Sequence, residues 1–461
     1  MKKLKKLFII IFGSILLLLL IVVCLGFGAH FYGANYESKS LDKVEVNHED
    51  MITVKAVDRG LYDKNGNLIQ LKGINFGNWL IQEGWMSCNS LGVTLDENGN
   101  FASVNSDGIV EGYLEVYQEE LDNALLNNPN LTKKQVEELW DVYYKAYCQE
   151  EDFKNIKEIG FNMIRLPMYY RNFMEGPDDN LVMRDDAFEL VDWFLSMAMK
   201  YDLYVILDLH GVVGGQNGFE HSGTREIDFW DNEKYIESMC ELWQNIARHY
   251  KEERADLAYT IAAYDLINEP AGATSNTGKK QWKVMDRLYD AIREVDKDHV
   301  IAFEGCWFFN ALPNPKKYGW ENVLYEYHLY NWNRPLVSND MFYALQWLTL
   351  SVSDYNVPKY IGEFTFFDEK EEWIKWLNQY DQMGFSFSMW NYKTISVGWW
   401  DSSWGLYVNK MNLFEEKLKL DVRTATYDEI YAVWSKEGTS ESYTSTGILM
   451  ESVNAYFEQF K

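Results

Sequence analysis

The chain has 461 residues and a formal net charge of -27 at pH 7. This acidic balance excludes nucleic acid and anionic membrane surfaces as electrostatic partners, whereas a neutral, polar substrate is compatible with it. Aromatic residues make up 16% of the chain and include 18 Trp. Most of them must be core, but such an excess also suits stacking on the apolar faces of sugar rings.

The N-terminus predicts a membrane anchor. Residues 1–6 are basic, and residues 7–25 are apolar apart from Gly13 and Ser14. About 20 apolar residues span a bilayer as a helix, and a basic flank stays in the cytoplasm. A cleaved signal peptide is the alternative, although residues 26–28 offer a poor cleavage site. Either way the bulk of the chain is expected outside the cytoplasm, membrane-tethered if the segment stays and secreted if it is removed.

The whole chain divides into three expected parts. Residues 1–28 would form the basic tip and anchor, residues 29–58 a polar tether, and residues 59–461 one catalytic domain. The five cysteines lack CxxC spacing, so neither a zinc site nor a disulfide scaffold is indicated. We expect buried free thiols at the four that lie beyond the apolar segment: Cys88, Cys148, Cys240 and Cys306.

The first elements along the chain are read from turn and capping signals. Residues 61–69 predict a β-hairpin about Asn65-Gly66, and residues 71–76 a short apolar strand. Residues 87–107 are expected to be loop. A helix should follow the capping box that begins at Thr132. A second helix, residues 150–159, should end at Gly160.

From Phe161 onward strands and helices alternate. Strands are predicted at 161–167, 203–209, 260–267, 300–303, 323–327, 360–362 and 385–389. Helices are predicted at 187–198, 235–250, 280–295, 369–380, 427–434 and 448–457. With residues 71–76 as the first, these make eight strands and predict an α/β fold, a (β/α)8 TIM barrel with long βα loops. A doubly wound open sheet is the alternative, but no glycine-rich phosphate loop follows any strand.

Polar residues stand where the predicted strands end. Strand 260–267, for example, stops abruptly at Asn268-Glu269-Pro270. All strand C-termini of a barrel meet at one face, so these residues should converge. The set is Glu83, Arg165, His210, Asn268, Glu269, His328, Tyr330, Glu363 and Trp390.

Two glutamates on separate strands suit glycoside cleavage, one as proton donor and the other as nucleophile or activator of water. Metal-dependent hydrolysis is the chemical alternative, with His210, His221 and His328 as conceivable ligands. No HExxH or Asp-rich spacing supports it, so neither a metal nor a cofactor is expected.

These motifs resemble glycoside hydrolase family five, a group of retaining (β/α)8 glycosidases. Asn268-Glu269-Pro270 matches the acid/base motif, and Gly362-Glu363-Phe364 resembles the nucleophile motif. Residues 71–80, 150–154, 160–167, 208–211, 215–219 and 222–223 resemble the exo-β-1,3-glucanase branch of that family most closely.

The resemblance implies a role for each tip residue. Glu269 would be the acid/base and Glu363 the nucleophile, while Asn268 would hold the sugar 2-hydroxyl. Arg165 and Tyr330 would orient the nucleophile. The remaining substrate-binding residues would be Glu83 and His210 on sugar hydroxyls, Trp390 as stacking platform, Phe219 on the acceptor side, and His328. Several positions depart from the branch, among them Glu220, which replaces an aspartate, and His221, which interrupts the usual loop.

The resulting expectation is a retaining β-glycosidase that acts on β-glucan, with β-1,3-glucan as first choice. The membrane would be a partner through the N-terminal helix only, and nucleic acid would not be one. An endo-β-1,4-glucanase or a glucan transglycosylase on the same fold remains open, as does a non-catalytic carbohydrate-binding protein.

Overall fold

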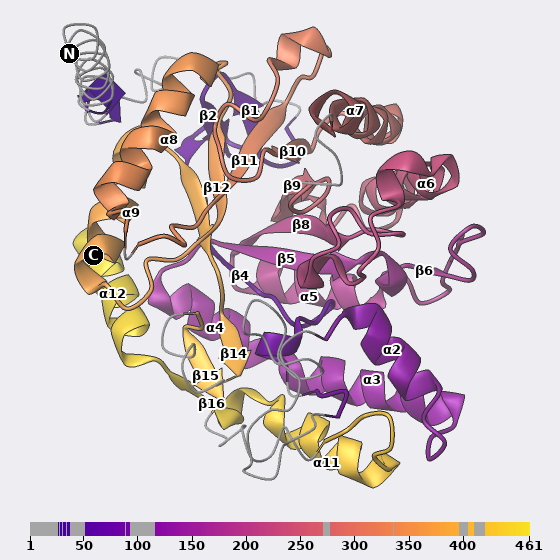
Figure 1. The fold of residues 1–461 in the computed structure, drawn as a ribbon. Coiled ribbons are helices and arrows are strands. Elements are labelled where there is room, and N and C mark those ends of the chain that lie inside the picture. Colours follow the sequence, from indigo (N-terminus) through magenta and orange to yellow (C-terminus); the bar gives the residue numbers. More distant parts are fainter. Residues whose placement is uncertain are drawn as a thin grey trace, which may run out of the picture.

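The computed structural model describes residues 51–87, 89–92, 116–270, 277–334, 336–395, 404–409 and 420–461, together with short stretches within 26–36. Its centre is a closed barrel of eight parallel strands in the order β10-β11-β12-β13-β4-β5-β8-β9 (Figure 1). The strands are β4 (Lys72–Asn75), β5 (Met163–Tyr169), β8 (Tyr204–Gly211), β9 (Ile261–Asp265), β10 (Val300–Glu304), β11 (Val323–Leu329), β12 (Lys359–Phe364) and β13 (Ser386–Met389). The predicted barrel is therefore confirmed, and the open doubly wound sheet is excluded.

Helices surround the barrel and cover its outer face, which is why most strand residues are buried on both sides. They are α4 (Glu150–Ile159), α5 (Glu189–Lys200), α6 (Glu233–Arg248), α7 (Thr277–Val295), α8 (Asn339–Ser353), α9 (Lys370–Met383) and α12 (Gly447–Phe457). Two more helices, α3 (Lys133–Tyr147) and α11 (Tyr427–Glu437), pack against one another, and α12 packs on α9 (Figure 1).

Local signals set several boundaries as expected. Thr132 and Gln135 form the capping box at the start of α3. Gly160 ends α4 with a φ of 124°, a conformation that glycine adopts without strain. The predicted hairpin is present as β2 (Gly60–Tyr62) and β3 (Leu68–Ile69), with Leu61 opposite Ile69.

Other elements were not predicted. Helix α8 was missed because it exposes apolar side chains such as Met341, Leu345 and Val352, so its apolar residues do not mark one face. The helix α2 (Gln118–Leu126) was also missed, as were the pair β6 (Met174–Glu175) and β7 (Val182–Met183). A small sheet of β14 (Lys393–Ile395), β15 (Tyr407–Asn409) and β16 (Tyr443–Ser445) follows the barrel. No α-helix joins β10 to β11, whose described connection contains only a 3-10 turn, η8 (Pro315–Lys317).

The predicted tether, residues 29–58, is partly built into the fold. Its last residues form β1 (Lys55–Val57), which pairs with β2, and Tyr36 packs edge-on against Phe385 with ring centroids 5.7 Å apart. Within the described part of the chain no helix is long and apolar enough to cross a membrane. The predicted anchor, residues 7–25, lies outside that part, as does most of the predicted loop 87–107.

Three of the four cysteines in question lie within the described residues, and all three are free thiols. Cys148 and Cys306 are buried, as predicted, and Cys240 is partly buried. Cys88 lies outside the described residues.

Candidate active site

A cavity of about 920 Å³ opens at the carboxyl ends of the barrel strands, and we call it the mouth cavity. Eight of the ten predicted site residues line it: Glu83, His210, Phe219, Glu269, His328, Tyr330, Glu363 and Trp390. The other two, Arg165 and Asn268, are buried beneath it. Arg165 donates hydrogen bonds to Asn268 and to Glu363. The predicted convergence of strand tips is thus confirmed.

Glu363 lies in β12 and is held from two sides. Arg165 Nη1 donates to its Oε1 at 3.0 Å, and the Tyr330 hydroxyl donates to its Oε2 at 2.8 Å. Burial raises the pKa of the Glu363 carboxyl, while His328, Arg165 and the Tyr330 hydrogen bond act in the opposite direction. The carboxylate is therefore fixed in orientation and faces the cavity.

Glu269 follows β9 and adopts a φ of 39°, which is unusual for a residue with a side chain. Its backbone N–H donates to Glu304 Oε2. Its carboxyl oxygens contact two histidines: Oε1 lies 2.9 Å from His328 Nδ1, and Oε2 lies 3.2 Å from His221 Nε2. One carboxyl oxygen each from Glu269 and Glu363 and one ring nitrogen of His328 lie within 4.8 Å of one another.

Arg165 organises the floor of the mouth cavity. Its guanidinium donates to Asp265 Oδ2 at 2.8 Å, to Asn268 Oδ1 at 2.9 Å and to Asn75 Oδ1 at 3.2 Å. It also forms ion pairs at 3.2 Å with Asp208 and with Glu326. A fully buried arginine with several acceptors fixes the positions of the strands that carry them.

Sequence reasoning missed the buried acids of this floor, namely Asp208, Asp265, Glu304 and Glu326. Burial raises the pKa of Asp208, Glu304 and Glu326 well above the ordinary range, while the positive charge of Arg165 acts in the opposite direction on all three. A signal was present, since each is a carboxylate in an otherwise apolar strand. Gly362 is required here because a Cβ at that position would collide with the Glu326 carboxylate.

Trp390 and His210 line the mouth cavity side by side. Trp390 stacks on His210 with ring centroids 5.6 Å apart and an interplanar angle of 12°. His210 Nδ1 lies 2.6 Å from Asp208 Oδ2, and its Nε2 has no hydrogen-bond partner within the described residues. Burial lowers the pKa of His210 well below its usual value, so the ring is neutral.

Glu83 also lines the mouth cavity. It accepts a hydrogen bond from Trp85 Nε1 at 2.8 Å, and burial raises its pKa well above the ordinary range. Next to it Glu220 accepts from the backbone N–H of Gly84 and, at 3.3 Å, from that of Val116. Glu220 thereby joins the Glu83 loop to the loop that carries Phe219.

Part of the lining of the mouth cavity is aromatic. Phe219, Trp307, Phe308 and Trp332 are exposed and line the cavity. Of these only Phe219 was predicted; the other three lie in the loops that follow β10 and β11. Exposed rings around a polar cavity offer stacking surfaces for the apolar faces of sugars.

Glu269, His328 and Glu363 together present three atoms of the kinds that bind metal ions, all within 4.8 Å of one another. The guanidinium of Arg165 already provides a fixed positive charge 3.0 Å from Glu363, and Nδ1 of His328 is engaged with Glu269. Ion pairing and hydrogen bonding account for the cluster without a metal ion.

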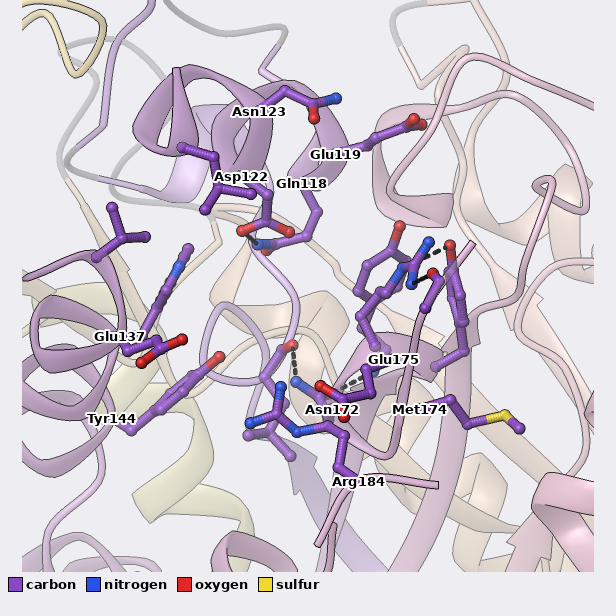
Figure 2. A pocket seen from close by; sticks show the side chains of 18 of the residues that line it. Gln118, Glu119, Asp122, Asn123, Glu137, Tyr144, Asn172, Met174, Glu175 and Arg184 are labelled. Atoms are coloured by element: carbon purple, nitrogen blue, oxygen red, sulfur yellow. Dashed lines mark hydrogen bonds between the residues drawn. The ribbon is translucent and has the colours of Figure 1, made fainter. Parts of the chain in front are cut away.

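A second cavity, of about 480 Å³, lies between α2, α3 and the β6–β7 pair (Figure 2), and we call it the side cavity. Asp122 and Gln118 extend into it from α2, Glu137 and Tyr144 from α3, and Glu175 from β6. None of the ten predicted site residues lines it.

A closed parallel barrel with two close carboxyl groups at the carboxyl ends of its strands is typical of the (β/α)8 glycosidases. The family model "Cellulase (glycosyl hydrolase family 5)" matches residues 123–396, which is more than half of the chain. The chain belongs to glycosyl hydrolase family 5.

Curated relatives are glycosidases by name, and one solved structure shares the fold. The chain is 28% identical over 286 residues to a "Beta-xylosidase" of Phanerodontia chrysosporium, covering 61% of this chain and 52% of that protein. It is 27% identical over 323 residues to the "Sporulation-specific glucan 1,3-beta-glucosidase" of Saccharomyces cerevisiae, covering 67% and 66%. The matches thus span about half to two-thirds of these relatives. The crystal structure of AoRut shares the fold, with a TM-score of 0.52, 17% identity and coverage of 70% of this chain and 89% of that one.

Proposed function

We propose that this protein is a retaining β-glycosidase that cleaves β-glucan, β-1,3-linked glucan first, by double displacement with two glutamates. The observation that carries the proposal is the pair Glu269 and Glu363, whose carboxyl oxygens approach within 4.8 Å. Retaining enzymes place the two carboxyl groups about 5 to 5.5 Å apart, whereas inverting enzymes leave about 6.5 to 9.5 Å for a water molecule. The relatives named glucan 1,3-beta-glucosidase support the choice of substrate.

In the first step Glu363 attacks the anomeric carbon while Glu269 gives its proton to the departing glycosidic oxygen. Arg165 and Tyr330 hold the two oxygens of Glu363, which favours its anionic, nucleophilic form. In the second step Glu269, now ionised, takes a proton from water, and the hydroxide displaces Glu363 from the sugar.

The remaining site residues would bind the sugar. Asn268 turns its Oδ1 toward Arg165, which leaves its amide nitrogen as donor for the 2-hydroxyl. Trp390 would stack under the ring, while His210 Nε2 and Glu83 would meet the hydroxyls of the terminal unit.

We propose exo action, because Glu220 joins the Glu83 loop to the Phe219 loop at one end of the mouth cavity. A bridge between two loops at that end would favour binding of a chain terminus over a passing chain. The exposed rings of Trp307, Phe308 and Trp332 favour a second candidate, transglycosylation, because they could hold an acceptor sugar against water.

The experiment is a substrate panel of laminarin, cellulose, xylan and aryl β-glycosides, with Glu363→Gln as the inactive background. Glucose released one unit at a time from laminarin supports the proposal. Release of internal fragments from cellulose would contradict exo-β-1,3 action and indicate an endo-β-1,4-glucanase. Longer oligosaccharides formed from a short donor would indicate a transglycosylase. Tight glucan binding without turnover in any assay would leave only a carbohydrate-binding protein.

We further propose that residues 1–28 anchor the protein, with residues 59–461 as a catalytic domain outside the cytoplasm. The basic residues 1–6 before the apolar run 7–25 support this. Protease added to intact cells should remove the domain if the proposal holds, and should leave it intact if the domain lies inside.

A further inference from the structure

The side cavity takes no part in the proposed reaction, yet it has the size of a ligand-binding site. Its volume of about 480 Å³ lies within the range of about 300 to 1,000 Å³ that is usual for small-molecule sites. Its walls come from three separate segments of the chain, namely α2, α3 and the β6–β7 pair. The chemistry of this lining determines which class of ligand would fit.

Trp140 of α3 contributes an aromatic ring with an unused donor. The ring stacks on Tyr144, one turn further along α3, with ring centroids 5.6 Å apart and an interplanar angle of 21°. Trp434 of α11 packs against it with ring centroids 4.9 Å apart, so the indole is held in place. The side chain lines the cavity, and its Nε1–H has no hydrogen-bond partner within the described residues. A fixed indole with an unused N–H suits a ligand ring that is apolar on its faces and polar at its edge.

Tyr169, at the end of β5, adds a buried hydroxyl that also lacks a partner. The residue is 3% exposed and lines the side cavity. Its ring packs against Gly211 and Gly223, where a Cβ would lie 2.7 Å from a ring carbon. The hydroxyl forms no hydrogen bond within the part of the chain that the structure describes. A hydroxyl this deeply buried normally has a partner, and a hydroxylated ligand in the cavity would supply one.

The charges of the lining argue against an ionic ligand. Its three basic side chains, Lys133, Arg171 and Arg184, are all paired with carboxylates, so no basic group of the lining is left to bind an anion. A metal ion is not indicated either. Among the described residues the one group of three close ligand atoms lies in the mouth cavity. The lining therefore fits a neutral, polar ligand.

The side cavity adjoins the mouth cavity across the first turn of α2. Tyr117, the residue before this helix, lines the mouth cavity, whereas Gln118 and Glu119, its first two residues, line the side cavity. The turn is tied to the loop between β8 and α6. The Tyr117 hydroxyl donates to the carbonyl of Gly218 at 3.1 Å, and the backbone N–H of Glu119 donates to the carbonyl of Gly223 at 2.9 Å. A long ligand that reaches one cavity is thus close to the other.

We propose that the side cavity is a second, non-catalytic binding site for neutral sugar units of a polysaccharide. Trp140 contacts the sugar ring and donates from Nε1 to one hydroxyl, and the Tyr169 hydroxyl bonds to another. Glu137, which extends into the cavity from α3, accepts from a third (Figure 2). The class of ligand follows from the lining. Only the identity of the sugar, a β-glucan, rests on the proposed function.

The first test measures binding at Trp140 without turnover. In full-length Glu363→Gln protein labelled with 5-fluorotryptophan, the ¹⁹F resonances of Trp140 and Trp390 are assigned by their loss in Trp140→Phe and Trp390→Phe. Addition of laminarihexaose should shift the Trp140 resonance until it saturates. A Trp140 resonance that stays in place, whether or not that of Trp390 responds, would overturn the proposal.

Two neighbouring glutamates on α3 provide a matched pair of variants. Glu137 lines the side cavity and Glu138 does not, and each pairs with the lysine four residues before it. Glu137→Ala should raise the dissociation constant measured at Trp140 by about tenfold, because the sugar loses one hydrogen bond to a charged acceptor. Glu138→Ala should leave it unchanged. Equal constants in the two variants would mean that Trp140 only reports binding in the mouth cavity, and would overturn the proposal.

The last comparison separates this inference from the proposed function. If wild-type protein hydrolyses no β-glucan while the Trp140 resonance still responds to a neutral hexaose, the proposed function fails and the second site stands. A response to an anionic oligogalacturonate in place of the neutral hexaose would overturn the assignment of a neutral ligand.

Discussion

The mouth cavity and the side cavity contain similar residue types in different settings. Both are lined by carboxylates, tyrosines and tryptophans. In the mouth cavity the two central carboxyls, Glu269 and Glu363, are buried, and each has hydrogen-bonded partners from other strands. In the side cavity Glu119, Glu137 and Glu175 are exposed on the surfaces of α2, α3 and the β6–β7 pair. Figure 2 shows these three side chains together with Asp122.

Burial and fixed hydrogen-bond partners, rather than residue type, therefore distinguish the candidate active site from the side cavity. A carboxylate that is exposed and mobile keeps ordinary acidity, while one that is buried among fixed donors can be held in the protonation state that a reaction requires. Substitutions in the two cavities should therefore have effects of very different size.

The largest effect is expected for Glu363→Ala. Loss of the nucleophile should lower kcat by about 10⁵-fold, because no other described group is placed to attack the anomeric carbon. Steady-state rates on laminarin and an aryl β-glucoside measure this, with an unchanged Tm as control. Residual activity within tenfold of wild type would remove Glu363 from the mechanism.

Glu269→Gln should cost about 10²- to 10⁴-fold on substrates with poor leaving groups, the usual contribution of a general acid. With a dinitrophenyl leaving group, which departs without a proton, the first step should be nearly unaffected. The comparison of the two substrates by burst kinetics checks the assignment. An equal loss on both would indicate a role other than proton donation.

Tyr330→Phe should lower kcat/KM by about 10- to 100-fold, since it removes one hydrogen bond to the charged Glu363. The matched control is Tyr144→Phe, whose ring lies in the side cavity. A loss of equal size in both variants would contradict the contrast between the cavities.

The acid limb of kcat/KM should lie above the pH at which an ordinary glutamate titrates. Burial raises the pKa of Glu363, and only its ionised form attacks, so activity is lost as pH falls through that raised value. In Tyr330→Phe the limb should move to still higher pH, because the anion loses a donor. A pH profile with its acid limb at or below pH 4 in wild type would refute this.

The smallest effect concerns Asp122 in the side cavity. Burial raises its pKa to about 7, so the folded state keeps a proton that the unfolded state loses near pH 4. The stabilisation that comes from this proton is therefore complete below about pH 4, and the free energy of unfolding falls as the pH rises from about 4 to about 7. Asp122→Asn should flatten this slope and raise Tm at pH 7 by about 2 to 4 °C, with activity within about twofold. A large loss of activity would make the side cavity part of the site.

Much of the barrel could be predicted from the sequence because its strands are short apolar runs that end in polar residues. The run that ends at Asn268 and Glu269 is one example, and the run that ends at His210 is another. In a barrel such ends converge by necessity, so eight of the ten predicted residues line one cavity.

The rest of the site could not be predicted, because it depends on tertiary packing that leaves no periodic pattern in the sequence. Glu304 and Glu326 lie inside apolar strands and act on the site through their neighbours, the backbone N–H of Glu269 and the guanidinium of Arg165. The link from Glu220 to Gly84 joins loops that are 136 residues apart. His221 contacts the side-chain amide of Asn217, and that amide is oriented by the backbone carbonyl of Glu269 and the backbone N–H of Phe219. These relations are set by tertiary contacts, which local sequence does not specify.

The central claim is that Glu269 and Glu363 perform a double displacement. The most direct test is proton NMR of the sugar released from a β-glucoside, recorded before mutarotation. Retention predicts that the β-anomer appears first and the α-anomer grows in later. Initial release of the α-anomer would show a single displacement by water and would contradict the roles assigned to both glutamates.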